Sequence, residues 1–187
     1  MSELPLPDPP LSNGSVALRP FQVTDVPALA RACRDPAIVR YAVAIASRDL
    51  DWDARTWLTG VEASRRAGLR LELAVVSCES GELLGSIALS NIAREHRRAM
   101  VSFWVVPEAR GQGVAARTLR LLAGWAFESL ALALARLELF VEPENVASQR
   151  VAERCGFVRE GLLRSRFVSH GQRRDSVVFG LLAGELR

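Results

Sequence analysis

The most constraining feature of the chain is an apolar, strand-like run that passes through a glycine turn directly into a helix. The run over 101–106 ends at Pro107, residues 110–113 read Arg-Gly-Gln-Gly, and a helical pattern then continues to about Leu130. N–H groups at the start of a helix lack an intrahelical acceptor, and the helix dipole adds positive potential there. A strand, a glycine turn and a helix start in this order therefore predict a site for a phosphate or pyrophosphate.

Two nucleotide-binding loops have comparable glycine spacing. A P-loop requires a Lys after its second glycine, but all 24 cationic residues of this chain are Arg. A dinucleotide fingerprint belongs to the first strand–helix unit and needs an acidic residue about 20 positions later. Here several strands precede the turn and residues 130–134 are wholly apolar. The P-loop is excluded and the dinucleotide site is disfavoured, which leaves another phosphate compound or a glycine turn without a ligand.

The order of the other elements indicates one mixed α/β domain. Residues 1–14 contain four prolines, so we expect a tail or an extended strap with no secondary structure, and we place the domain at 15–187. Thr24-Asp25 is expected to cap the first helix, and Asp35-Pro36 to end it. Periodicity and turn residues predict strands at 16–20, 71–78, 83–92, 100–106, 136–141, 157–168 and 176–182, and further helices at 51–66, 113–130 and 146–154.

Composition narrows the class of protein. The net charge is +3 and no basic cluster is interleaved with aromatic residues, so neither nucleic acid nor a membrane is an expected partner. Three scattered cysteines disfavour a disulfide framework and suit the cytoplasm, and no Cys/His cluster has metal-ligand spacing. We find no signal peptide and no apolar run that could cross a bilayer.

Two motifs together resemble the GNAT superfamily of N-acetyltransferases. The first, Arg110-Gly111-Gln112-Gly113-Val114-Ala115, is similar to the family's acetyl-CoA pyrophosphate loop. The second comprises Asn145-x-x-Ser148, Gly156-Phe157 and Glu160-Gly161, and it resembles the RimJ/RimL-like branch that acetylates ribosomal-protein N-termini. The resemblance implies a single α/β domain with a mostly antiparallel, twisted sheet of about seven strands. That sheet is splayed between strands 4 and 5 and has helices on both faces.

The resemblance also implies acetyl-CoA as co-substrate, with no metal. The residues implied to bind it are Val105, Val106, Arg110, Gly111, Gln112, Gly113, Val114, Ala115, Asn145 and Ser148. A backbone N–H on the strand at 104–106 is the expected oxyanion donor. The tyrosine that protonates the leaving thiolate in many relatives is replaced by Ala152, so Ser148 is the candidate catalytic acid. From the residues alone, Asn145 is equally well a helix N-cap and Ser148 a solvent-facing serine.

The general base is not identified by either motif. Phe167 stands where the related branch carries a Glu, and Met100 stands where other relatives often do. A water chain is one alternative, and the remaining side-chain candidates are Glu72, Glu95, His96, His170 and Asp175.

The expected activity is acetyl transfer to a primary amine, either a protein N-terminus or a small molecule, and a homodimer is a further expectation. Two alternatives stay open. One is a CoA-binding or regulatory protein without turnover, and the other is a transferase for a larger acyl group such as succinyl.

Overall fold

The protein is built on one eight-stranded sheet with the strand order β1-β2-β3-β4-β5-β6-β8-β7. The computed structural model describes residues 2–42, 54–169 and 171–187. The strands are β1 (Leu11–Ser12), β2 (Val16–Arg19), β3 (Arg70–Ser77), β4 (Leu83–Ala93), β5 (Arg98–Val105), β6 (Arg136–Val141), β7 (Val158–Ser169) and β8 (Gln172–Leu182).

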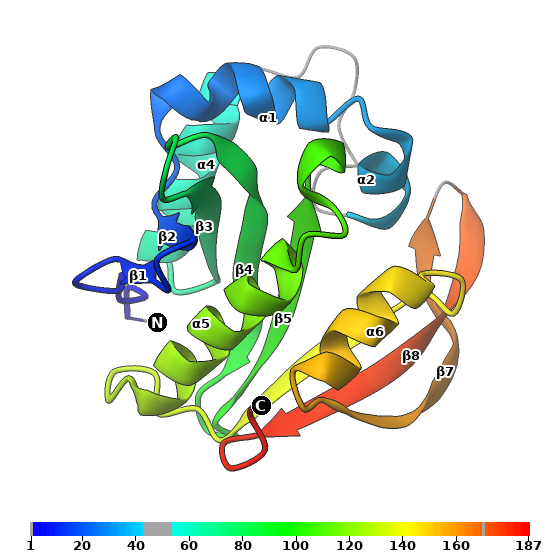
Figure 1. Cartoon of the computed structure of the whole chain (residues 1–187). Coiled ribbons are helices and arrows are strands. Elements are labelled where there is room, and N and C mark those ends of the chain that lie inside the picture. Colours follow the sequence, from blue (N-terminus) through cyan, green and yellow to red (C-terminus); the bar gives the residue numbers. More distant parts are fainter. Residues whose placement is uncertain (1, 43–53, 170) are drawn as a thin grey trace.

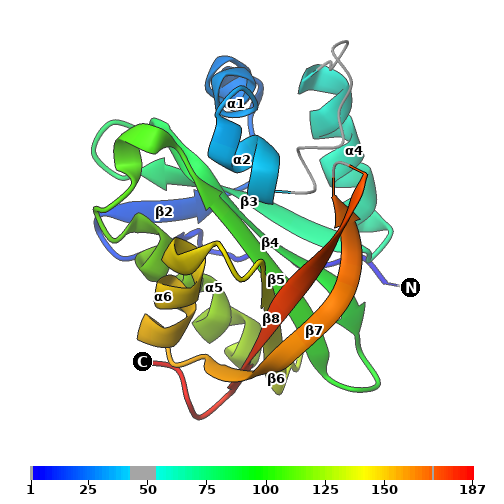
Figure 2. The same ribbon diagram turned by 90° about the vertical axis from the view of Figure 1, so that its right-hand side faces the viewer.

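Helices cover both faces of the sheet, as predicted (Figure 2). The cluster containing Leu29, Ile38 and Trp57 packs α1, α2 and α4 on one face. The larger cluster, with Leu119 and Leu122 of α5 at its centre, packs the other face, where α6 also lies. The helices are α1 (Val26–Ala32), α2 (Pro36–Tyr41), α4 (Ala54–Arg66), α5 (Val114–Glu128) and α6 (Val146–Arg154).

The sheet opens between β5 and β6. These two strands pair in parallel, whereas every other neighbouring pair is antiparallel. Their register contains three residue pairs and ends at Met100 and Glu138, after which the strands diverge as a V (Figure 1). Strands 4 and 5 of the sequence prediction are β5 and β6, so the mostly antiparallel, splayed sheet is confirmed.

The N-terminal segment differs from the expectation. Residues Leu11–Ser12 form the strand β1 against β2, which brings the sheet to eight strands instead of about seven. Leu4 is fully buried in the larger core cluster, and its N–H donates to the carbonyl of Arg65 at 3.0 Å. The segment is thus a strap that carries a short strand. Its prolines conceal this from the sequence, because they interrupt the alternation that marks a strand.

Two helix boundaries also differ. Asp35-Pro36 ends α1 but also begins α2, because the Asp35 side chain accepts from the Ile38 N–H at 2.9 Å and proline fits the first helical turn. Asp25 is the N-cap residue of α1, but its side chain makes no cap hydrogen bond to that helix. The carboxylate accepts from Arg19 and, at 2.8 Å, from the N–H of Gln22, which caps the short 3-10 helix at Val23–Asp25. The first residues of the helix predicted at 51–66 lie outside the described residues, and β8 begins four residues earlier than predicted, at Gln172.

Leu4→Ala should lower the free energy of unfolding by about 2–5 kcal/mol, because it opens a cavity at a fully buried site. Leu6→Ala, at a side chain that is 37% exposed, is the matched control and should change it by less than about 1 kcal/mol. Chemical denaturation of both variants checks this. An equally small change in the free energy of unfolding for both variants would mean that residues 1–14 are a loose tail.

Candidate functional site

The predicted phosphate loop has the backbone geometry of an anion cradle. Gly111 and Gly113 both have φ of +76°, a left-handed conformation that favours glycine. Gly113 is the N-cap of α5 and provides no side-chain cap. The N–H groups of the first helical turn, from Val114 to Ala116, therefore face outward without a capping side chain. This is the arrangement that binds phosphate at helix N-termini.

The loop's two long polar side chains brace the loop itself. The Arg110 guanidinium donates to the Val105 carbonyl at 3.1 Å and to the Asp35 carboxylate at 2.5 Å. The Gln112 amide donates to the Glu108 carbonyl at 2.7 Å. The sequence motif implied that Arg110 and Gln112 bind the cofactor. That role stays a prediction; in the structure both side chains donate to protein acceptors, and their main chain is free to contribute to an anion site.

Arg117 is a residue of this site that the motif did not include. It lies one helical turn after Gly113, and its guanidinium donates to the Gln112 carbonyl at 2.7 Å. Its Nε is buried and has no hydrogen-bond partner among the described residues. The side chain thus folds back over the loop and adds a full positive charge to the helix dipole. Its position four residues after Gly113 was the signal available in the sequence.

The open edge of β5 presents Val105 to the splay. The Val106 N–H donates to the Leu84 carbonyl on β4 at 2.9 Å. Because hydrogen-bonding groups alternate along an antiparallel strand, the N–H of Val105 points away from β4, toward the side that β6 has left. Opposite Val105 lies Gly85, where a Cβ would come within 2.2 Å of the Trp104 carbonyl, so only glycine permits this approach. A backbone donor at 104–106, expected for the oxyanion, is therefore available at Val105.

Asn145 and Ser148 lie together at the start of α6. The Asn145 side chain accepts from the Ser148 N–H at 3.2 Å, so the N-cap interpretation of Asn145 is correct. Both side chains are half-buried. In Figure 1 the N-terminal ends of α5 and α6 both lie at the open end of the V, which brings the two sequence motifs to the same gap.

The five side-chain candidates for a general base differ in burial and in hydrogen-bond partners. Glu72 is buried, but Ser86 and Arg70 donate to its two oxygens at 3.0 and 2.8 Å. Glu95 and His96 are 81% and 63% exposed, at the tip of the β4–β5 hairpin. Asp175 accepts from the N–H of Ser165 at 2.8 Å. His170 lies outside the described residues.

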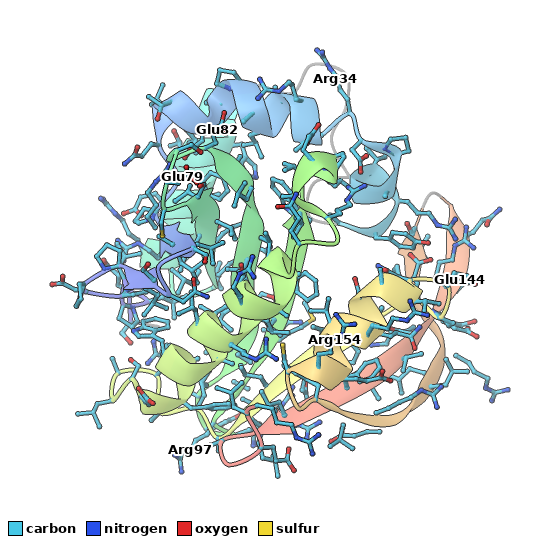
Figure 3. The ribbon with its side chains drawn as sticks, viewed as in Figure 1. Arg34, Glu79, Glu82, Arg97, Glu144 and Arg154 are labelled. Carbon is cyan, nitrogen blue, oxygen red and sulfur yellow. The ribbon has the colours of Figure 1, made fainter. Side chains whose placement is uncertain are left out.

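Glu142 is an acid that the sequence reasoning missed. It follows β6 directly and is 7% exposed, and its Oε2 has no hydrogen-bond partner among the described residues. The Asn145 N–H donates to its carbonyl at 2.9 Å, which fixes the loop, whereas the next acid, Glu144, is exposed (Figure 3). A buried carboxylate oxygen without a donor is costly and often marks a functional group.

The strand pattern of β6 gives the direction of Glu142. Leu137, Leu139 and Val141 belong to the core on the α5 face. Because side chains alternate along a strand, Phe140 points to the opposite face, and Glu142 is the next residue in the same alternation. This alternation was the signal that the sequence offered for Glu142.

The described residues contain no cluster of three His, Cys, Asp or Glu side chains that could hold a metal ion. Among the described helices, none combines the length and apolarity that crossing a membrane requires.

Comparison with known proteins identifies the family of the chain. The acetyltransferase (GNAT) domain family matches residues 15–158. The chain belongs to the GNAT acetyltransferase family. It is 34% identical over 105 residues to the putative ribosomal N-acetyltransferase YdaF of Bacillus subtilis, a match that spans 56% of this chain and 56% of YdaF. It is 27% identical to the uncharacterized N-acetyltransferase p20 of Bacillus licheniformis, over 91% of this chain and 94% of p20.

Solved structures share the GNAT fold. Mycobacterium smegmatis RimJ in complex with CoA-disulfide superposes with a TM-score of 0.79 at 26% identity, over 94% of this chain and 87% of RimJ. Spermidine N-acetyltransferase from Vibrio cholerae in complex with CoA and spermine superposes with a TM-score of 0.77 at 22% identity, over 92% of this chain and 98% of that chain.

The Asp35–Arg110 pair should stabilise the protein in a pH-dependent way. The hydrogen bond from Arg110 holds the pKa of Asp35 below its ordinary value of 3.8. At neutral pH, Asp35→Asn should lower the free energy of unfolding by about 0.5–1 kcal/mol, because it removes a partly exposed ion pair but keeps a capping side chain. The wild type's advantage is complete above the ordinary pKa and is lost as the pH falls through the lowered folded-state pKa.

Denaturant unfolding at a series of pH values, with Asp35→Ala as the variant that loses both charge and cap, measures this. A wild-type advantage over Asp35→Asn that persists at the most acidic pH would show that the ion pair is not its source.

Proposed function

We propose that this protein transfers an acetyl group from acetyl-CoA to a primary amine by direct attack on the thioester. The observation that carries the proposal is the uncapped start of α5, reached through two left-handed glycines, beside the point where β5 and β6 separate. The solved RimJ and spermidine N-acetyltransferase complexes contain CoA, which supports the same donor here.

The donor binds through the main chain of one loop and the gap beside it. Its pyrophosphate accepts hydrogen bonds from the N–H groups at 113–116, and Arg117 adds charge. Its pantetheine arm enters the splay, between Val105–Val106 on one side and Asn145 with Ser148 on the other. Arg110 and Gln112 contribute by holding the loop in this shape.

Three groups of the chain carry the chemistry. Glu142 takes a proton from the acceptor ammonium, and the neutral amine then forms the N–C bond with the thioester carbon. The Val105 N–H donates to the oxyanion of the tetrahedral intermediate. As the C–S bond breaks, the Ser148 hydroxyl donates its proton to the leaving sulfur and accepts the remaining proton of the attacking nitrogen, so that the amide and the free thiol leave and Ser148 is regenerated. We prefer Glu142 to the four earlier candidates that the structure describes, because its Oε2 is buried and has no hydrogen-bond partner among the described residues.

Release of free thiol from acetyl-CoA, measured with a panel of primary amines and N-terminal peptides, tests the activity. Turnover with at least one amine is expected. Tight CoA binding without turnover for any acceptor would instead favour the non-catalytic CoA-binding protein. Faster turnover with succinyl-CoA than with acetyl-CoA would favour the transferase for larger acyl groups.

Gly113→Asp should reduce CoA affinity by about 100-fold or more, because it places a carboxylate where the pyrophosphate must lie. Gly81→Asp is the matched control: its φ is +73° and a Cβ there meets nothing within 4 Å. Gly81 lies in the β3–β4 turn between Glu79 and Glu82, away from α6 (Figure 3). Calorimetric titration with CoA measures both variants. Equal affinities would refute the loop as the pyrophosphate site.

Ser148→Ala and Glu142→Gln should impair different steps. Ser148→Ala should lower kcat while leaving CoA affinity unchanged, because it removes only the proton donor to sulfur.

Glu142→Gln should lower kcat/KM for the amine by about 100-fold at neutral pH. Its deficit should shrink as the pH approaches the amine's own pKa, where the acceptor is already neutral. A deficit that is the same at every pH would remove Glu142 as the base.

A further inference from the structure

The outermost strand of the sheet, β7, carries an irregular segment that its neighbour holds in shape. The β7–β8 register shifts between Leu163 and Phe167, and Ser165 within the shift has a left-handed φ of +51°. The Ser165 N–H donates to the Asp175 carboxylate at 2.8 Å, and the Arg173 guanidinium donates to the Ser165 carbonyl at 3.3 Å. Side chains from β8 therefore fix the bulge, which is how sheets redirect side chains near functional sites.

This bulge concentrates unneutralised positive charge. Arg164 and Arg166 lie on it, and Arg173 of β8 contacts it through the Ser165 carbonyl; none of the three joins an ion pair among the described residues. Asp175 is the one acid that lines the hollow here, and the Ser165 N–H already occupies one of its oxygens. The hollow measures about 750 Å³ and is lined by Leu162, Leu163, Arg164, Ser165, Arg166 and Asp175.

One of these arginines reaches the reaction gap. The Arg166 guanidinium carbon lies 4.9 Å from the centre of the Phe140 ring. Phe140 is on β6 beyond the last β5–β6 pair, at Met100 and Glu138, and it precedes Glu142 by two residues on the same alternating face. Arg166 therefore connects the hollow to the strand that borders the splay. In Figures 1 and 2 the end of β7 and the start of β8 reach the level of α2.

We propose that the hollow in β7 is an acceptor subsite for carboxylate groups, and that the preferred acceptor is an amine followed by acidic side chains. Arg166, with Arg164 and Arg173 beside it, binds these carboxylates while Glu142 faces the amine. This proposal rests on the proposed function. Guanidinium groups suit the task because they present paired donors that match a carboxylate. The same charge repels a polyamine, which sets this chain apart from the spermidine N-acetyltransferases it resembles in fold.

A matched peptide series tests the subsite. The peptides share an N-terminal Ser and differ only in the next three residues: Asp-Glu-Asp, Asn-Gln-Asn or Lys-Lys-Lys, with spermidine as a further acceptor. At low salt we expect kcat/KM for the acidic peptide to exceed that for the amide peptide by about tenfold, the size of a partly exposed charged contact. The Lys peptide and spermidine should be poorer still. Added salt should shrink the preference because it screens charge.

Variants locate the effect. Arg166→Gln should remove most of the preference for the acidic peptide, so that the ratio of kcat/KM for the acidic peptide to that for the amide peptide falls close to one. Arg159→Gln is the control, because Arg159 is an exposed arginine of the same edge strand outside the bulge. CoA affinity should be unchanged in both. Equal use of the acidic and amide peptides, or a loss of CoA affinity in Arg166→Gln, would overturn the subsite.

Peptide binding to the CoA-saturated protein separates this proposal from the proposed function. Tighter binding of the acidic peptide, lost in Arg166→Gln, would support the subsite even if no acceptor turned over. Turnover of all peptides without any charge preference would overturn the subsite and leave the acetyltransferase intact.

Discussion

The site depends on two parallel strands that are joined at one end and separated at the other. At the closed end Glu138 of β6 accepts from Arg98 of β5 at 2.9 Å and from Arg136 of its own strand at 3.0 Å. At the open end β5 remains paired with β4, because Gly85 has no Cβ and the Trp104 carbonyl can approach its Cα closely. β6 instead follows β8, with which it pairs along its whole length. The gap is therefore a consequence of strand pairing on both sides.

Each functional group reaches the gap by a short path from this frame. The turn after β5 delivers the start of α5, and the loop after β6 delivers Glu142 and the start of α6. On the far side, β8 pairs with β6 and carries β7 with its arginine-lined bulge. Under the proposed function, the donor and acceptor sites thus lie on opposite sides of one opening. The proposed donor site is made mainly of backbone, whereas the proposed acceptor site is made of side chains.

For this reason the sequence carried a clearer signal for the proposed donor site than for the proposed acceptor site. The left-handed backbone at 111 and 113 favours glycine, so these two residues are visible in the sequence. The first and last residues of β6 and α6 agree with the prediction, because local periodicity and capping define them. The partner of Arg110 could not be predicted, since Asp35 lies 75 residues away in the chain. Arg117 and Glu142 had only weak signals in the sequence, and the fold adds the decisive one, a buried Nε and a buried Oε2 without a hydrogen-bond partner among the described residues. The short strand β1 was not predicted, because the prolines of residues 1–14 obscure its pattern. The helix α2 was not predicted, because Asp35-Pro36 was interpreted only as the end of the preceding helix.

We propose that CoA occupies the gap between β5 and β6, against the start of α5. Titration of isotope-labelled protein with CoA, followed by backbone amide NMR, tests this placement. We expect the largest chemical-shift changes at the amides of Val105, Val114, Ala115 and Ala116, smaller changes at Ser148 and none in the turn containing Gly81. Saturable binding that leaves the amides of Val105 and the first turn of α5 unshifted would show that CoA binds elsewhere.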